Sequence, residues 1–254
     1  MAKHSALFRY IESVQGERAW GRFLDAGTGL KSIQWVLDLQ TEQWTAVTGA
    51  PGDAARVRSE VKARQRPRDR IETGNWASAD LLKGEVFDTV LADYLLGAVE
   101  GVSPYFQPYL FARLRPLTRG VLYTIAVEPY VPTSRPQSNS ERIVWEIGRY
   151  RDACLLLTGG FPYREYPMQW VVDHIKRAGF SVQRTKRFPI RYKTRFVNTQ
   201  IDLCVPLLKT LNDSSLARAL LERGQALKAE ALAAIEVDGA LRAGHDYVIV
   251  AEPC

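Results

Sequence analysis

An acid and two glycines follow a short apolar run near the N-terminus, in the order that a nucleotide-binding turn requires. Asp25, Gly27 and Gly29 come directly after Phe23 and Leu24, which are typical of a buried strand. Glycine lets the backbone turn tightly and approach a ligand without a Cβ clash. Parallel α/β sheets bind ligands at the carboxyl ends of their strands. We therefore interpret this segment as a nucleotide-binding turn at a crevice of an α/β sheet.

The kind of nucleotide is narrowed by the residue three positions beyond the second glycine. A dinucleotide site usually has a third glycine there, but this chain has Ser32. The fingerprint that cradles a pyrophosphate is therefore incomplete. Of the candidate ligands of this turn, one that needs only the first two glycines is therefore favoured, and NAD is the alternative.

The same turn resembles the first motif of the class I S-adenosylmethionine-dependent methyltransferases, in which acid-x-Gly-x-Gly follows the first strand. The resemblance continues in order: 73–76 is similar to the turn that holds adenine, 87–94 to the fourth-strand motif, and 114–120 to the approach to the fifth strand. It implies S-adenosylmethionine as the cofactor and methyl transfer as the reaction. The cofactor-binding residues that it implies are Asp25, Gly27, Thr28, Gly29, Thr48, Asn75, Trp76 and Asp93.

Two positions depart from the family pattern. Members commonly end the second strand in an acid that binds the ribose hydroxyls, whereas this chain has Thr48 there. A hydroxyl cannot make the charge-assisted bidentate pair of a carboxylate, so we predict weaker cofactor binding, although Asp53 could reach over from the next helix. Asn75 stands where many members have Asp, and its amide oxygen can still accept from the adenine amino group.

The residues that contact the acceptor follow from the same resemblance. Methyl transfer needs few catalytic side chains, because the cofactor already carries an activated leaving group. Asp93 and Tyr94 are the candidate base for an acceptor that carries a proton, although Asp93 is equally suited to cap the following turn. The candidate substrate-binding residues, from aromatic-rich loops that could also simply pack a core, are Tyr94, Glu128, Tyr163, Arg164 and Tyr166.

Three functions remain open at this point. The favoured one is methylation of a small polar metabolite through an amine, carboxylate-bearing, thiol or thioether acceptor. The first alternative is a nucleic-acid or protein methyltransferase that uses the basic run 184–195. A solvated strand edge explains that run more simply, and no Asn-Pro-Pro-Tyr motif follows the fourth strand, so a nucleic-acid partner is not expected. The second alternative is a non-catalytic, cofactor-binding partner subunit, which Thr48 keeps open.

Seven apolar segments have the composition of strands, and helical patterns separate most of them. The strands are expected at 23–27, 44–48, 70–73, 87–92, 120–127, 180–183 and 247–251. Their alternation with helices indicates a mostly parallel sheet with helices on both faces. The family resemblance adds a Rossmann-like topology and an antiparallel last strand.

These elements are expected to form a single domain over 1–254. Its parts are an N-terminal helix (1–20), a substrate lid (129–170) and a helical insertion before the last strand (196–243). The apolar stripe of the insertion is expected to cover the sheet or to form a homodimer contact.

The composition of the 254 residues, 46% apolar and 24% charged, excludes collagen-like and wholly disordered chains. The net charge of +6 suits an anionic ligand as well as a nucleic acid. Three cysteines without a CxxC pair, and histidines that stand alone, indicate neither a disulfide framework nor a metal site. The chain shows no secretory signal and no apolar run of the roughly 20 residues that a membrane span needs. We therefore expect a cytoplasmic protein without a membrane partner.

Overall fold

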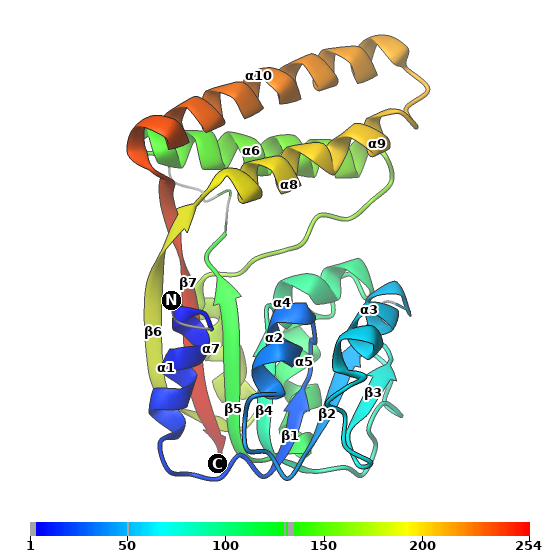
Figure 1. Ribbon diagram of the computed structural model, residues 1–254, viewed down its shortest axis with the longest axis vertical. Helices are drawn as coiled ribbons and strands as arrows, with labels where there is room; N and C mark the ends of the chain where they lie inside the picture. The colour runs from blue at the N-terminus through cyan, green and yellow to red at the C-terminus, as the bar shows by residue number, and fades with distance from the viewer. Residues whose placement is uncertain (1–3, 50, 130, 132–134) are drawn as a thin grey trace. The chain divides into compact units, whose positions relative to one another are not determined.

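A seven-stranded sheet is the main element of the structure (Figure 1). This computed structural model describes residues 4–49, 51–129, 131 and 135–254, and its strand order is β3-β2-β1-β4-β5-β7-β6. The strands are β1 (Arg22–Asp25), β2 (Gln43–Thr48), β3 (Arg70–Thr73), β4 (Phe87–Asp93), β5 (Thr118–Val127), β6 (Phe180–Tyr192) and β7 (Leu241–Pro253). Strands β1 to β5 pair in parallel, and β7 runs in the opposite direction. The predicted Rossmann-like α/β sheet with an antiparallel last strand is confirmed.

Ten α-helices and two 3-10 turns connect or flank the strands in the described part of the chain. They are α1 (Ala6–Gln15), α2 (Leu30–Val36), α3 (Pro51–Val61), α4 (Leu95–Ala98), α5 (Gln107–Leu114), α6 (Asn139–Leu157), α7 (Met168–Arg177), α8 (Thr194–Asp202), α9 (Cys204–Leu208) and α10 (Ser214–Asp238), with 3-10 turns η1 (Val99–Gly101) and η2 (Arg115–Leu117). Helix α1 ends well before residue 20, because Gly16 adopts a φ of 57° and its amide closes the last turn on Glu12. Residues 1–3 of the predicted N-terminal helix lie outside the described residues.

The chain packs as two compact units. The first contains Met1–Val127, Tyr163–Phe188 and Tyr247–Cys254, and the second contains Glu128–Pro162 and Pro189–Asp246. The predicted lid is therefore divided between the two units, and its residues 130 and 132–134 lie outside the described residues. The predicted single domain stays a prediction, and each unit is described by itself.

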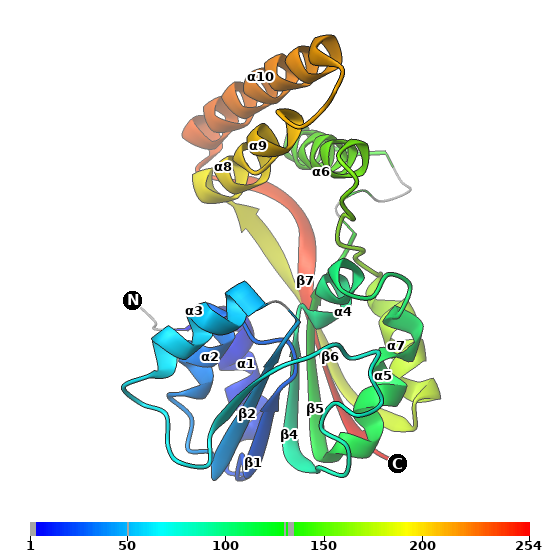
Figure 2. The same cartoon turned by 90° about the vertical axis from the view of Figure 1, so that its right-hand side faces the viewer.

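The first unit buries the two faces of its sheet under different helices (Figure 2). Successive residues of a strand point to opposite faces. Phe23 accordingly packs with residues of α1, α2 and α3, whereas Leu24 packs with residues of α4, α5 and α7. The same alternation separates Tyr123 from Leu122 in β5. Buried, mainly apolar strands of this kind are expected where helices cover both faces of a parallel sheet.

The second unit is built around one apolar core that α6, α8, α9 and α10 share. Leu227 and Ala231 of α10 are fully buried in this core together with Ile143 and Ile147 of α6. The apolar stripe of the insertion therefore packs against the matching apolar face of α6 within the second unit. The expectation that the insertion covers the sheet stays a prediction.

The edge strand β6 continues well beyond the predicted 180–183 and carries most of the basic run. Side chains 183–187 are exposed or half-buried, as a solvated strand edge requires. Lys186 lies over the rings of Tyr10 and Phe188, with its Nζ 4.6 and 5.2 Å from the two ring centroids. Part of the basic run is thus used in contacts within the first unit.

Gly120 lies where the backbones of β4 and β5 come close together. A Cβ at this position would lie 2.5 Å from the backbone oxygen of Asp88. A backbone atom cannot move aside as a flexible side chain can, so we expect Gly120→Ala to lower the free energy of unfolding by about 2 kcal/mol. Urea unfolding followed by tryptophan fluorescence measures the change. The matched control is Gly52→Ala, because a Cβ at Gly52 meets no atom within 4 Å; equal losses in both variants would contradict the steric explanation.

Candidate functional site

The glycine turn lies at the carboxyl end of β1, between β2 and β4. The amides of Ala26 and Thr28 donate to backbone oxygens of β4 and β2, each over 2.8 Å, so both neighbouring strands hold the turn. Helix α2 begins directly after it, and the hydroxyl of Ser32 exchanges hydrogen bonds with the amide and the carbonyl of Gly29. The serine that replaces the third glycine therefore fixes the start of this helix.

The two glycines of the turn are required for different reasons. A Cβ on Gly27 would lie 2.9 Å from the Cβ of Leu95, so the protein's own packing requires a glycine there. A Cβ on Gly29 would meet no atom within 4 Å, and the φ of −133° at this residue suits any side chain. Neither packing nor backbone conformation explains Gly29. Space for the close approach of a ligand does explain it.

Asp25 lies behind the turn and is fully buried. Among the described residues, neither of its carboxylate oxygens has a hydrogen-bond partner of good geometry. Burial raises the pKa of Asp25 to about 6, and the neighbouring groups of Ser32, Thr28 and Gly27 offset the burial only in part. Asp25 is not part of the described walls of the two cavities beside the turn. Its position is that of a buried support for the turn.

A cavity of about 240 Å³ opens at one side of the turn, at the carboxyl ends of the strands. It brings together five predicted cofactor-binding residues, which are Gly27, Thr28, Thr48, Asn75 and Trp76. The sequence analysis did not find the rest of the wall, which includes Gly49, Gly74, Leu95, Ala98, Val99 and Val102. The apolar residues directly after the fourth strand were the available signal for α4 and η1, but they are equally typical of an ordinary core helix.

Asn75 and Trp76 are already bonded to the protein. The indole of Trp76 is 3% exposed and its Nε1 donates to the carbonyl of Ala26 over 2.7 Å, so this ring forms part of the cavity floor. The Oδ1 of Asn75 accepts from the amide of Ala77 over 2.9 Å and from the hydroxyl of Ser103 over 2.7 Å. Because an amide oxygen has two lone pairs, a ligand amino group would have to replace one of these donors.

An acid does reach this cavity, although β2 ends in Thr48. Asp53, in the first turn of α3, lines the cavity together with Thr48. Its side chain is half exposed and forms an ion pair with Arg56 over 3.2 Å. The carboxylate of Asp53, from α3, therefore lines the same cavity as Thr48, which has only a hydroxyl at the end of β2.

A second cavity, of about 400 Å³, lies on the other side of the turn. Gly27, Thr28, Gly29 and Asp53 line it, and so do Asp93 and Tyr94 at the end of β4. Tyr94 has a φ of 49°, a left-handed conformation that is uncommon for a residue with a side chain. Its amide donates to the carbonyl of Ile125 over 2.9 Å, which fixes this corner. The predicted catalytic pair and Gly29 therefore share one space.

The loop that begins at Tyr163 is held to the first unit by a buried carboxylate. Arg164 donates from Nε to Oε1 of Glu100 over 2.8 Å, and the Glu100 side chain is 1% exposed. Burial pushes the pKa of Glu100 up, but hydrogen bonds from Gln107, the Tyr105 amide and Arg164 outweigh it and hold this pKa below its usual value. Arg164 is thus used in holding the loop.

The two tyrosines of this loop have different surroundings. Tyr163 is exposed and lines the 240 Å³ cavity. Tyr166 stacks on Trp170 with ring centroids 4.0 Å apart, and its carbonyl accepts from the hydroxyl of Tyr247 over 2.7 Å. Tyr163 is therefore placed to contact a ligand, whereas Tyr166 packs the core of the first unit.

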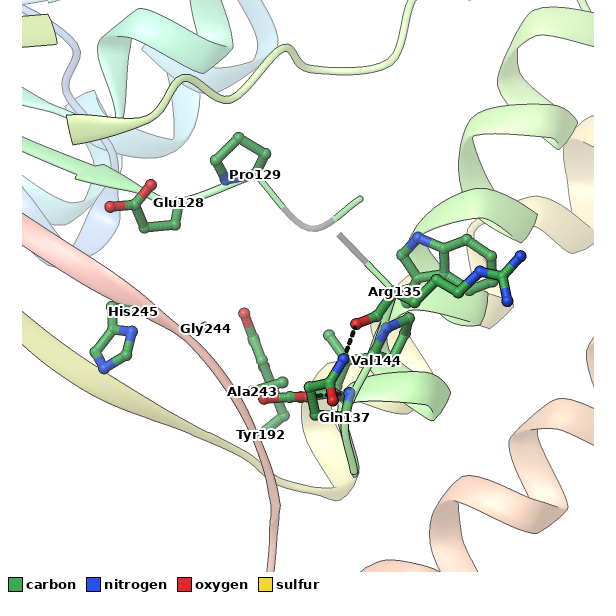
Figure 3. Close-up of a pocket in the computed structure, with 12 residues that line it drawn as sticks. Glu128, Pro129, Arg135, Gln137, Val144, Tyr192, Ala243, Gly244 and His245 are labelled. Atoms are coloured by element: carbon green, nitrogen blue, oxygen red, sulfur yellow. Dashed lines mark hydrogen bonds between the residues drawn. The ribbon is translucent and has the colours of Figure 1, made fainter. Parts of the chain in front are cut away.

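Glu128 belongs to the second unit and lines a different cavity (Figure 3). Its amide donates to the carbonyl of His245 over 2.9 Å. Of the predicted substrate-binding residues, only Tyr94 and Tyr163 line the cavities beside the glycine turn.

Comparison with known proteins identifies the architecture. A scan of protein-family models and a search of curated proteins both found no match. Among solved structures, BH2331 from Bacillus halodurans C-125, assigned as a methyltransferase, is similar to this chain with a TM-score of 0.61 and 12% identity, over 98% of this chain and 99% of that one. This chain has the class I methyltransferase fold.

Proteins with different named activities share this methyltransferase fold. The mycolic acid cyclopropane synthase CmaA1, solved in complex with SAH, aligns with a TM-score of 0.55 and 17% identity over 95% of this chain and 83% of its own. The [4+2]-cyclase SpnF aligns with a TM-score of 0.55 and 15% identity over 97% of this chain and 80% of its own. The site, and not the fold, must therefore carry the argument for function.

Within the described part of the chain, no helix combines the length and the apolar character of a membrane span.

Proposed function

We propose that this chain is an S-adenosylmethionine-dependent methyltransferase that acts on a small polar metabolite. The observation that carries this proposal is the open space at Gly29, beside two cavities at the carboxyl ends of the strands, in a chain with the methyltransferase fold. Gly29 lies in the wall of a cavity, where the absence of a side chain lets a ligand come close to the backbone. The acceptor would carry an amine, a carboxylate-bearing group, a thiol or a thioether.

The residues of the 240 Å³ cavity fit a nucleoside with a charged tail. When bound, S-adenosylmethionine supplies an activated methyl group for transfer. The turn at Gly27 and Gly29 would hold the tail, and Thr48 would bind the ribose together with Asp53. In the family that the chain resembles, an acid at the end of the second strand binds the ribose hydroxyls. We assign this role to Asp53, because Asp53 lines the same cavity as Thr48.

The acceptor side of the site is assigned to the end of β4. Asp93 and Tyr94 line the cavity that Gly29 shares, so a group bound there would lie beside the turn. If the accepting atom carries a proton, Asp93 takes it and Tyr94 orients the acceptor. Methyl transfer then depends mainly on alignment and on the exclusion of water.

Isothermal titration with S-adenosylmethionine tests the cofactor assignment. We expect one saturable site per chain, and no measurable binding at millimolar ligand would end the proposal. Incubation with S-adenosylmethionine and a panel of small acceptors, with S-adenosylhomocysteine release as the readout, then tests turnover. Tight association with a partner protein and no turnover would favour the non-catalytic subunit. Salt-dependent retention on RNA or DNA would favour a nucleic-acid substrate on the basic strand.

Location and assembly are also proposed from the residues. Cys154 and Cys204 lie buried in one core as free thiols, and a reducing compartment such as the cytoplasm maintains thiols in this state. A homodimer through the inserted helices stays a prediction, which sedimentation of the purified chain can test.

Arg164 offers a test of the loop that begins at Tyr163. We expect Arg164→Ala to weaken S-adenosylmethionine binding about fivefold, close to 1 kcal/mol, because the loop loses its bond to Glu100 and Tyr163 no longer covers the cavity. The apparent KM for the acceptor should rise as well. Arg119→Ala is the matched control, since Arg119 pairs with Asp88 at the amino end of β4. Unchanged affinity and unchanged turnover for Arg164→Ala would remove this loop from the site.

A further inference from the structure

The second unit contains a cavity of about 280 Å³ whose described wall belongs to that unit alone (Figure 3). This volume is close to the lower end of usual small-molecule sites, roughly 300 Å³. The residues used in the argument below are Glu128, Arg135, Glu141, Val144, Trp145 and Tyr192. They come from the segment after β5, from the first half of α6 and from the end of β6. Three separate stretches of chain therefore converge on one space.

The wall of this cavity contains two carboxylates and one guanidinium. Glu128 and Glu141 both line it, whereas Arg135 directs its guanidinium away from Glu128 (Figure 3). The Oε2 of Glu141 accepts from the amides of Gln137 and Ser138 over 2.7 and 3.2 Å, so this carboxylate is fixed at the start of α6. Two carboxylates in the wall of a cavity in a chain of net charge +6 favour a cationic ligand there.

Glu128 is placed by the backbone of the strands. Its amide is bonded to the carbonyl of His245, and Figure 3 shows both residues on one side of the cavity, opposite Gln137. Next to His245, Gly244 adopts a φ of 63°, and a Cβ there would meet no atom within 4 Å. The backbone of β7 therefore leaves space in the wall at Gly244.

Another part of the wall is formed by apolar and aromatic side chains, which contacts outside the cavity hold in place. Val144 is 3% exposed and Tyr192 is 8% exposed. The Tyr192 ring packs on Phe196 with centroids 4.1 Å apart, and the Arg149 guanidinium lies 4.5 Å from the centroid of the Trp145 ring. A ligand would therefore meet preformed walls and would not have to order them, which lowers the cost of binding.

We propose that this cavity binds a small organic cation with an apolar body, such as a primary amine. The protonated amine would lie against Glu128, and the apolar body would lie against Val144 and Tyr192. An ammonium donates hydrogen bonds that a carboxylate accepts, and aromatic faces add attraction for a cation. The inference goes beyond the proposed function, because the acceptor side proposed above lies at the end of β4, and amine binding in this cavity needs no S-adenosylmethionine.

The test compares benzylamine with benzyl alcohol, which has nearly the same shape and no charge at pH 7. Isothermal titration of the full chain should give saturable binding of benzylamine, with benzyl alcohol at least tenfold weaker. Glu128→Gln should reduce benzylamine affinity at least tenfold and make the two ligands nearly equal. Equal affinity of both ligands for the unaltered chain, or no saturable binding at tens of millimolar benzylamine, would overturn the proposal.

Two further variants keep the result interpretable. Glu236→Gln removes one negative charge from the exposed face of α10, outside this cavity, and should leave benzylamine affinity unchanged. Ala243→Leu fills the cavity from β7 and should abolish benzylamine binding. This variant still tests the proposal if Glu128→Gln does not fold. If Ala243→Leu folds and binds benzylamine as the unaltered chain does, the site lies elsewhere and the proposal is wrong.

Adding S-adenosylmethionine distinguishes whether the bound cation is a methyl acceptor or an effector. Methylation of the amine, seen as release of S-adenosylhomocysteine, supports this cavity only if Ala243→Leu abolishes it. Methylation that survives in a folded Ala243→Leu protein would place the amine at the end of β4 and would overturn the proposal. Amine binding that changes S-adenosylmethionine affinity without methylation identifies an effector, and this result also supports the cavity as a cation site. A chain that binds benzylamine but not S-adenosylmethionine would defeat the proposed function and leave this inference standing.

Discussion

Gly29→Ala is expected to leave the fold intact and to weaken S-adenosylmethionine binding about thirtyfold, which is close to 2 kcal/mol. The added methyl group would meet no protein atom within 4 Å, and the extended backbone at this residue accepts alanine. The methyl group would instead occupy space that the proposed cofactor tail needs. A loss of binding without a loss of stability is the signature of a glycine kept for a ligand.

Two other glycines serve as controls for this substitution. Gly52→Ala should change neither stability nor affinity by much, because its Cβ also points into open space but lies away from the turn. Gly27→Ala should lower stability, because its Cβ would press against Leu95. Titration and thermal unfolding of the three variants separate the effects. Undiminished cofactor affinity in a folded Gly29→Ala protein would refute the proposed place of the cofactor tail.

Asp25→Asn is expected to raise the free energy of unfolding at pH 7 by up to about 3 kcal/mol. The carboxyl of Asp25 is fully buried, and burial raises its pKa to about 6 from an ordinary value of 3.8. At neutral pH the folded chain must therefore hold an ionised group that water solvates better. An amide has nearly the same shape and no charge. Its buried N–H groups reduce the gain in unfolding free energy if they find no acceptor.

The pH dependence of this gain has a definite sign. Between about pH 4 and pH 6 the folded state binds a proton at Asp25 that the unfolded state has lost, so the contribution of this group to stability falls as pH rises. The difference in unfolding free energy between Asp25→Asn and the unaltered protein should be smallest below pH 4. It should increase up to pH 6 and then level off. Urea unfolding at a series of pH values measures it, and a difference that does not vary with pH would show that Asp25 ionises normally.

The same variant tests how Asp25 acts on the site. Because Asp25 is absent from the described cavity walls, we expect S-adenosylmethionine affinity to fall by no more than about fivefold. A much larger loss would mean that the carboxylate contacts the cofactor or holds the turn in a conformation that the amide cannot maintain.

The residues of the proposed cofactor side could be predicted largely from local sequence. The turn from Asp25 to Gly29 is a continuous segment, and its chemistry depends on glycine at fixed spacing after a strand. Thr48 and Asn75 could be located because Thr48 ends β2 and Asn75 lies two residues beyond the end of β3. The carboxyl ends of parallel strands meet at one edge of a sheet. Short-range patterns with this geometric consequence are what sequence reasoning detects.

The acceptor side could not be read in the same way. Arg164 and Glu128 have suitable chemistry, but Arg164 is held by Glu100, 64 positions away, and Glu128 faces a cavity of the second unit. Buried Glu100 carries no local signal that distinguishes it from a surface acid. Its role depends on three donors that only the folded chain brings together.

The sequence alone determined the seven strands, their α/β order and the glycine turn after the first strand, because alternating burial and glycine conformation act over a few residues. Tertiary structure alone decided that the inserted helices pack on α6 and that Glu128 lies in the wall of a separate cavity. It also placed Asp53 beside Thr48, which the sequence had only allowed. These features depend on which apolar faces and charged groups meet across long stretches of chain, and that choice is made only when the whole core packs.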